Sequence, residues 1–241
     1  YGTKAPSIDL GVKLVATQDA VESDSFNNQY DKDATYPVTS AAELKNAVAY
    51  SGKFNVTEDI DVNETLNVKN VGVVLNAAGK KISNSSDIWN EGNGNWSLVS
   101  ARGANGTSLV IKDGNFEAKE NDCYTVDVQD GASVTIENGT FVGNVHAVYV
   151  LKGTAHIKGG FYSIQQKYPD ASKADEFVLN CYDANRAAGT ARIIVTGGTF
   201  VNFNPADCQA EGAHTNFVAD GYKVVSEKQA NGETWYTVVP A

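Results

Sequence analysis

Ser-Val-Thr-Ile-Glu-Asn-Gly-Thr-Phe, residues 133–141, is one of four similar stretches that decide the fold. The other three are residues 108–116, 155–161 and 192–200. Each stretch combines an alternating strand pattern, a glycine turn and a phenylalanine that opens another short strand, and the copy at 155–161 aligns with one residue fewer in its turn. Because self-similarity at a regular period is the signature of stacked repeats, the four copies predict successive turns of one solenoid.

The repeat also predicts what fills the interior of this solenoid. A further short strand is expected before each copy, at 97–101, 125–129, 147–151 and 177–182. The four phenylalanines are 25, 20 and 39 residues apart, which fits three-faced turns with an insertion at about 165–176 in the last one. Parallel strands stack about 4.8 Å apart, so equivalent side chains should meet in rows. The predicted aromatic stack is Phe116, Phe141, Phe161 and Phe200, and the predicted aliphatic row is Ile111, Ile136, Ile157 and Val195.

The two ends of the repeat region carry different signals. The capping-box pattern from Ser40 to Glu43 predicts a helix over about 41–50, which would cover the open N-terminal end of the solenoid. An Asn231-Gly232 turn between two alternating runs predicts a hairpin at the other end. The expected organisation is therefore an extended N-terminal arm over 1–37, a solenoid with its capping helix over 38–203, and a C-terminal cap with the hairpin over 204–241.

Composition excludes several classes of function. The chain has 241 residues, and 29 acidic against 19 basic residues give a net charge of −10. Such a chain lacks the clustered Lys and Arg that bind nucleic acid, so we expect no nucleic-acid partner. No apolar run reaches the roughly 20 residues of a transmembrane helix, so we expect no membrane insertion. The three cysteines are interpreted as buried free thiols, with a Cys181–Cys208 bridge left open.

Three runs at the start of the solenoid resemble a known superfamily. Residues 40–48, 54–62 and 73–82 look like the entry of pectate-lyase-like right-handed β-helix proteins, with a capping helix, a strand ending in Asp and a strand leading to a Gly-Lys-Lys-Ile turn. This resemblance implies an all-β fold, a single right-handed parallel β-helix. The C-terminal part, from Gly197 to Pro240, is similar to the C-termini of β-helix proteins encoded by bacteriophages and by some bacterial surface proteins.

The resemblance also implies where an enzyme of this superfamily would have its catalytic residues. Pectate lyases use acidic Ca²⁺ ligands and a basic residue on one exposed strand face, and the equivalent residues here are Asp127, Tyr149 and Asn180. One carboxylate is too few for paired acid–base catalysis, which needs two about 5–10 Å apart. We therefore expect no catalytic residues and no enzyme, with a polysaccharide lyase or hydrolase as the alternative, and no cofactor.

The remaining polar residues are interpreted structurally. A Ca²⁺ site was considered for the acidic turn residues, but backbone capping in turns explains them more simply, so no metal site is expected. These residues are Asp113, Asp122, Asp127 and Asp130. The histidines are expected in solvent or in turns; they are His146, His156 and His214.

Aromatic residues supply the candidate ligand site. Trp89 and Trp96 flank an Asn- and Gly-rich loop at 90–95, and Tyr149 and Tyr182 are expected on one face. Because sugars stack on exposed aromatic rings, this region could bind carbohydrate; the alternative is that Trp96 begins a strand and packs on a neighbour. The predicted ligand-binding residues are Trp89, Trp96, Asp127, Tyr149, Asn180 and Tyr182.

The favoured function is a non-enzymatic structural protein of a bacteriophage virion: a capsid decoration, head fibre or spike component on the virion surface. Residues 1–37 would dock on other capsid or tail proteins, and a host surface glycan and a homotrimer are further expected partners. The alternatives are a secreted or cell-surface protein that binds or cleaves polysaccharide, and a bacterial adhesin module.

Overall fold

Parallel β-sheets dominate the protein. The computed structural model describes residues 34–103, 106–120, 122–166 and 177–241. In these residues the strands form one 13-stranded sheet and one five-stranded sheet. Successive repeats pair in parallel, whereas strands near the C-terminus pair antiparallel. The expected all-β fold class is confirmed.

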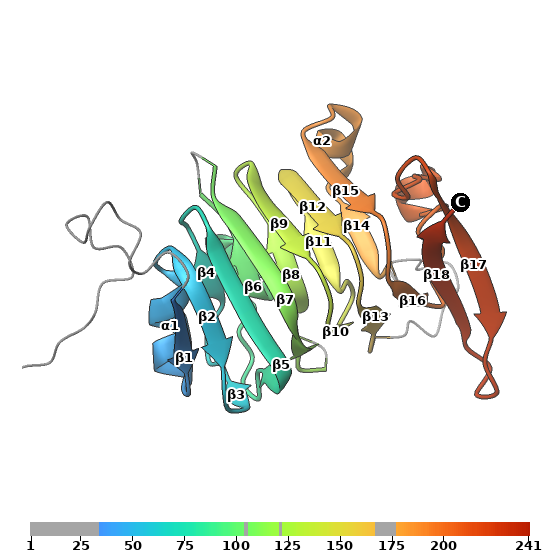
Figure 1. The fold of residues 1–241 in the computed structure, drawn as a ribbon. Helices are drawn as coiled ribbons and strands as arrows, with labels where there is room; N and C mark the ends of the chain where they lie inside the picture. Colours follow the sequence, from blue (N-terminus) through green and yellow to red (C-terminus); the bar gives the residue numbers. More distant parts are fainter. Residues whose placement is uncertain (1–33, 104–105, 121, 167–176) are drawn as a thin grey trace, which may run out of the picture.

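The strands fall into three columns in which a strand of one repeat pairs with the matching strand of the next (Figure 1). The first column is the five-stranded sheet. Its strands, in order, are β4 (Leu66–Val68), β6 (Ser97–Ala101), β8 (Tyr124–Val128), β11 (Val148–Val150) and β14 (Leu179–Cys181). The last four of these correspond to the four short strands that the sequence predicted before each repeat.

The second and third columns share the large sheet, because the long strands β5 and β7 take part in both. The second column is β1 (Thr35–Val38), β2 (Gly52–Val56), β5 (Val73–Ser83), β7 (Ser108–Glu117), β9 (Ala132–Ile136), β12 (Gly153–Ile157) and β15 (Ala191–Val195). The third adds β3 (Ile60–Asp61), β10 (Thr140–Gly143), β13 (Phe161–Ile164), β16 (Thr199–Val201), β18 (Thr234–Pro240) and β17 (Tyr222–Lys228). From β8 onward, each repeat visits the three columns in the same order.

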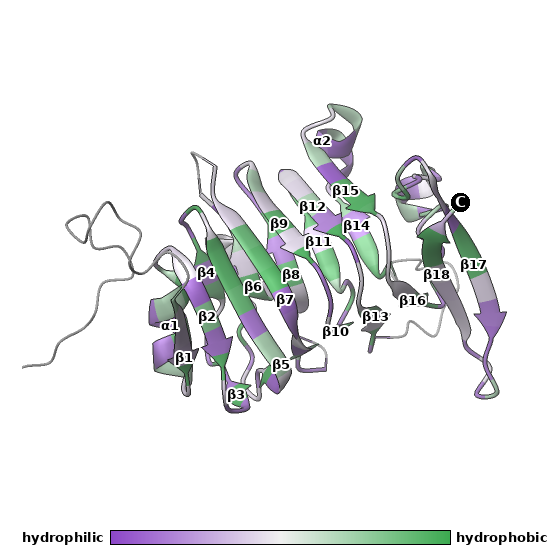
Figure 2. Ribbon diagram, viewed as in Figure 1, coloured by the Kyte–Doolittle hydropathy of each residue, from purple (hydrophilic) through white to green (hydrophobic). Residues whose placement is uncertain are grey.

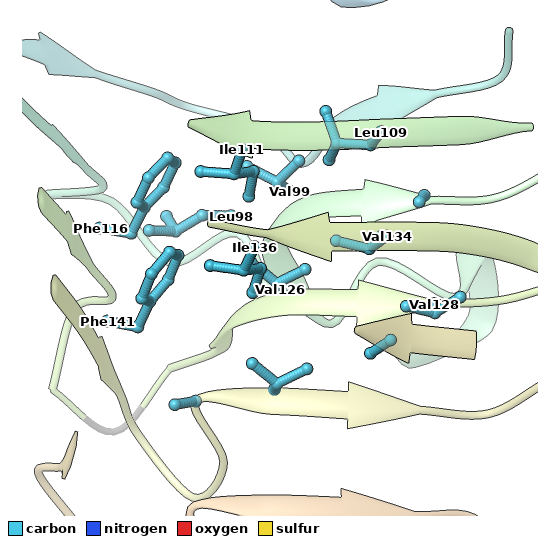
Figure 3. Packing of buried hydrophobic residues seen from close by; sticks show 14 of the residues in the cluster. Leu98, Val99, Leu109, Ile111, Phe116, Val126, Val128, Val134, Ile136 and Phe141 are labelled. Carbon is cyan, nitrogen blue, oxygen red and sulfur yellow. The ribbon is translucent and has the colours of Figure 1, made fainter. Parts of the chain in front are cut away.

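The core lies between the columns and is made of aligned apolar rows (Figure 3). In the first column Val99, Val126 and Val148 are in register, and all three are buried. The predicted aliphatic row is confirmed, because Ile111 pairs with Ile136, Ile136 with Ile157 and Ile157 with Val195. Along these strands buried residues alternate with more exposed ones, as in β7, and Figure 2 shows both apolar and polar residues on the strands.

The predicted aromatic stack is correct at three positions and wrong at the fourth. Phe116, Phe141, Tyr162 and Phe200 stack with successive ring centroids 5.0 Å apart, and all four are fully buried. Tyr162, not Phe161, pairs with Phe141. The third repeat therefore needs no gap, because Phe161 occupies the position of Thr140. A tyrosine fits the stack because its hydroxyl donates a hydrogen bond to the Gly159 carbonyl at 2.7 Å.

Glycine recurs before each stacked ring for a steric reason. Gly139 has a φ of 126°, which side-chain-bearing residues rarely adopt. A Cβ atom on Gly139 would lie 2.7 Å from the carbonyl oxygen of Gly114 in the preceding repeat, and one on Gly160 would lie 2.9 Å from that of Gly139. The turns thus stack so closely that only glycine fits.

Both ends carry the elements that the sequence predicted. Helix α1 (Ala41–Val48) begins at Ser40, whose hydroxyl accepts the Glu43 N–H, and it buries Leu44 and Val48 beside β4. At the other end β17 and β18 form the hairpin, and β18 pairs with β16 (Figure 1). A second helix, α2 (Asp183–Ala187), and two 3₁₀ turns, at Glu91–Asn93 and Ala210–Gly212, lie in connections.

The predicted arm over 1–37 overlaps the sheet at its end. Thr35–Val38 forms β1, which pairs in parallel with β2, so the end of the predicted arm belongs to the sheet. The rest of the arm, and most of the predicted insertion at 165–176, lie outside the described residues. Where the structure is described, no helix has the length and apolar character needed to span a membrane.

Candidate ligand-binding face

Five rings gather against the first column, and Tyr149 lies at their centre. Its ring centroid is 5.3 Å from that of Tyr124, 5.5 Å from that of His146 and 6.2 Å from that of Trp96. Trp89 meets Tyr124 edge to face at 5.5 Å. We call these five residues the aromatic cluster. Burial raises the pKa of Tyr149 to about 12, so its hydroxyl stays protonated and can donate a hydrogen bond at neutral pH.

The aromatic cluster reaches solvent at one end, through Trp89, which is 40% exposed. Tyr182 is 47% exposed, and its backbone N–H donates to the carbonyl of Val150, the residue after Tyr149, at 2.9 Å. Trp96 and Tyr149 are half-buried, as expected if Trp96 packs on a neighbour at the start of a strand. His146 was expected in solvent or in a turn. It lies in the bend between β10 and β11, but it is buried in the aromatic cluster rather than in solvent, and its Nδ1 lies 2.5 Å from the Phe177 carbonyl oxygen.

A polar row runs through the same column. Ser100, Asp127, Tyr149 and Asn180 are in register on β6, β8, β11 and β14. The alignment expected from the repeats is therefore present, but the expected exposure is wrong for Asp127, which has no exposed surface, and for Asn180, which is 8% exposed. The sequence could not reveal this burial, because the segment that covers Asp127 comes from an irregular connection rather than from the repeats.

Asp127 is held by hydrogen bonds on both carboxylate oxygens. Ser97 Oγ donates to Oδ1, and Gln129 Nε2 donates to Oδ2 at 2.5 Å. Burial raises the pKa of this carboxyl to about 6; the hydrogen bonds from Ser97, Gln129 and Ser100 and the charge of Arg102 oppose that rise. Asp127 is thus a buried structural carboxyl with no free oxygen directed to solvent.

The connection between β5 and β6, residues 84–96, covers this face and carries both tryptophans. Arg102 Nη1 donates to the carbonyls of Asn93 and Gly94 at 2.9 and 3.0 Å, and Gln129 Nε2 donates to Gly94 at 2.8 Å. Because Gln129 also binds Asp127, the covering segment and the buried carboxyl share one hydrogen-bond network. Substitution at either point should affect the other.

A second buried carboxylate anchors the other end of this segment. Asp122 accepts the backbone N–H groups of Ile88 and Trp89 at 3.1 and 3.0 Å and also a side-chain hydrogen bond from Asn84. Burial and the hydrogen bond with Asp87 raise the pKa of Asp122, and the same hydrogen bond lowers the pKa of Asp87. The pair positions Trp89 at the solvent-facing end of the aromatic cluster.

No metal site was expected at the acidic turn residues, and their described contacts are with protein groups. Within the described ranges, no three His, Cys, Asp or Glu side chains are grouped as a metal would require. Asp113 instead accepts a hydrogen bond from Asn138. The three cysteines are buried and free, so the structure contains no Cys181–Cys208 bridge; Cys208 Sγ instead donates to the Leu179 carbonyl, two residues before Cys181, at 3.7 Å. Burial raises the pKa of Cys181 to about 12, which leaves this thiol protonated and unreactive at neutral pH.

Of the predicted site residues, Trp96 and Tyr149 are in direct contact and Trp89 joins them through Tyr124. Tyr182 lies near Tyr149, whereas Asp127 and Asn180 are buried in the row beneath. The sequence reasoning missed Tyr124 and His146. Tyr124 immediately precedes the predicted strand at 125–129. Trp89 reaches it only because of the path of the 84–96 segment.

Comparisons with known proteins do not identify the chain. The family models, the curated proteins and the solved structures all gave no match.

Proposed function

We propose that the chain is a single right-handed parallel β-helix and a non-enzymatic structural protein of a bacteriophage virion, such as a capsid decoration, head fibre or spike component. The repeated order of columns and the capped ends support the β-helix. The likeness of the C-terminal sequence to phage-encoded β-helix proteins supports the virion. Residues 1–33 would dock on a capsid or tail protein, and the stacked columns would project from the virion surface.

The burial of Asp127 is the observation that carries the non-enzymatic part. Asp127 is the one carboxylate in the polar row, where pectate-lyase-like proteins have their catalytic acids. It has no exposed surface. Both of its oxygens already accept hydrogen bonds. A general acid or base must come within hydrogen-bonding distance of substrate, and Asp127 in this position does not. Release of unsaturated sugars from an acidic polysaccharide by the purified chain would overturn this conclusion.

Deleting residues 1–33 is expected to abolish incorporation of the chain into phage particles. The deletion stops short of Thr35 because β1 pairs with β2 and belongs to the sheet. Incorporation is measured as the amount of the chain in gradient-purified particles, with the exposed Tyr50→Ala variant as the control that should incorporate normally. Unchanged incorporation of the truncated chain would contradict docking through this segment, and absence of the wild-type chain from particles would contradict the virion proposal.

A second candidate function, binding of a host or environmental glycan, is favoured by the aromatic cluster. Trp89, which contacts Tyr124, and Tyr182, which follows β14 beside the strand that carries Tyr149, are both exposed aromatic residues. Such rings stack on the apolar faces of sugars. This function fits a virion protein, a secreted protein and a bacterial adhesin alike.

Glycan binding predicts a local effect of substitution. Trp89→Ala and Tyr182→Ala should each weaken binding of a glycan found on an oligosaccharide array by about five- to tenfold, because each removes one stacking surface. Tyr50→Ala removes a tyrosine that is 59% exposed outside this face and should leave binding unchanged. Equal losses in all three variants, or no binding to any glycan on the array, would count against this function.

A further inference from the structure

Strand β17 ends the large sheet and leaves one edge unpaired among the described residues. It is the last strand in the sheet order and pairs there with β18 alone (Figure 1). The bonds from Ala241 N to Gly221 O and from Gln229 N to Glu233 O show that odd-numbered residues of β17 bond to β18. Because bonding directions alternate along an antiparallel strand, the backbone groups of Val224, Ser226 and Lys228 point to the open edge.

The side chains of β17 divide into two rows. Tyr222 and Val224 are partly buried and pack on the core. Lys223, Val225 and Glu227 form the opposite row and are exposed, with Val225 44% exposed. An open edge beside an exposed valine is a site where another strand can add. The order of charges in this row, basic and then acidic with valine between them, indicates which strand fits.

We propose that β17 pairs antiparallel with β17 of a second copy of this chain, about a twofold axis through Val225. In this register Lys223 of each copy faces Glu227 of the other, and the two Val225 side chains face each other. Val224 and Ser226 exchange backbone hydrogen bonds across the axis. The pairs in the exposed row are then the non-hydrogen-bonded ones, whose side chains approach more closely.

The charges select this register over its neighbours. A shift of two residues in the pairing places Lys223 opposite Val225, or Val225 opposite Glu227, and loses both ion pairs. Charged residues on an edge strand commonly prevent association. Here the two signs make the strand complementary to itself in one antiparallel register. The proposal does not depend on the virion or glycan functions.

Sedimentation velocity of the full chain over a range of concentrations tests the pairing. The wild type is expected to dimerise reversibly, and Glu227→Lys should weaken the dimer about tenfold or more because two ion pairs become like-charge pairs. The double variant K223E/E227K restores the opposite charges and should restore the dimer. Glu58→Lys, the same change at an exposed residue outside the hairpin, should have no effect.

A backbone variant separates edge pairing from other contacts. Ser226→Pro removes an N–H that points to the open edge and leaves the bonds between β17 and β18 in place, so this variant should be monomeric with a wild-type circular dichroism spectrum. A monomeric wild type at all concentrations overturns the proposal. A trimeric wild type also overturns it. A dimer that is weakened to the same extent by Glu227→Lys and by K223E/E227K overturns it as well.

Discussion

Replacing Phe141 by alanine should lower the free energy of unfolding by about 3–5 kcal/mol. The Phe141 ring is fully buried and stacks on Phe116 and Tyr162, with 5.0 Å between centroids on each side. Its removal leaves a cavity between two repeats, and the rigid strand spacing prevents the neighbouring rings from closing it. Urea denaturation followed by circular dichroism measures the loss.

Phe161→Ala is the matched control, because it makes the same chemical change one repeat further on. Phe161 is half-buried, pairs with Thr140 and contacts Trp235 edge to face at 5.0 Å, outside the stack. Its removal should cost clearly less than removal of Phe141. If Phe161→Ala destabilises the protein as much as Phe141→Ala does, the alignment based on phenylalanine is right and the observed register is wrong.

Asp127→Asn should make the protein more stable than the wild type at pH 7, by on the order of 2–3 kcal/mol. Burial raises the pKa of Asp127 from 3.8 to about 6, so the folded state binds this proton more tightly than the unfolded state does. The contribution of Asp127 to stability therefore falls as pH rises from about 4 to about 6, and it then stays constant. The asparagine variant lacks this titration.

The hydrogen bonds around Asp127 can accommodate an amide. The asparagine oxygen can accept from Gln129, and its NH₂ group can donate to Ser97 Oγ, which lies 2.9 Å from the Val99 carbonyl oxygen and can donate there. Unfolding free energies of both proteins between pH 4 and pH 7 measure the effect, and Glu58→Gln serves as the exposed control. A variant that is less stable than the wild type at pH 7 would show that the donors stabilise the ionised carboxylate by more than burial destabilises it, which contradicts the prediction.

Much of the strand order could be read from the repeats, because stacked strands require the same apolar pattern in every turn. The aliphatic row from Ile111 to Val195, the capping helix after Ser40 and the hairpin around Asn231 follow from local pattern alone. The aromatic stack did not follow completely. The phenylalanine pattern predicted Phe161 as the third ring of the stack. The residue that pairs with Phe141 in the next repeat is Tyr162, and its ring is the one that stacks there.

The candidate site was less predictable than the fold. The repeat pattern placed Asp127, Tyr149 and Asn180 in one row, and the structure has them there. Their burial depends on the 84–96 segment, which belongs to no repeat and is held by Arg102, Gln129 and Asp122. The local sequence pattern of such a segment does not predict which part of the sheet it packs on. The contacts of Trp89 and His146 in the aromatic cluster follow from its path and from long-range packing.

The amino-acid pattern alone was thus enough to identify an all-β chain of repeated strands, the capping helix and the terminal hairpin, because these depend on period, turn chemistry and alternation within a few residues. The tertiary structure decided which aromatic ring enters the stack, which carboxylates are buried and which rings meet solvent. Those outcomes depend on contacts between residues more than 20 positions apart, such as Trp89 with Tyr124 and Ser97 with Asp127. They are set by the register and by the covering segment rather than by any one stretch of sequence.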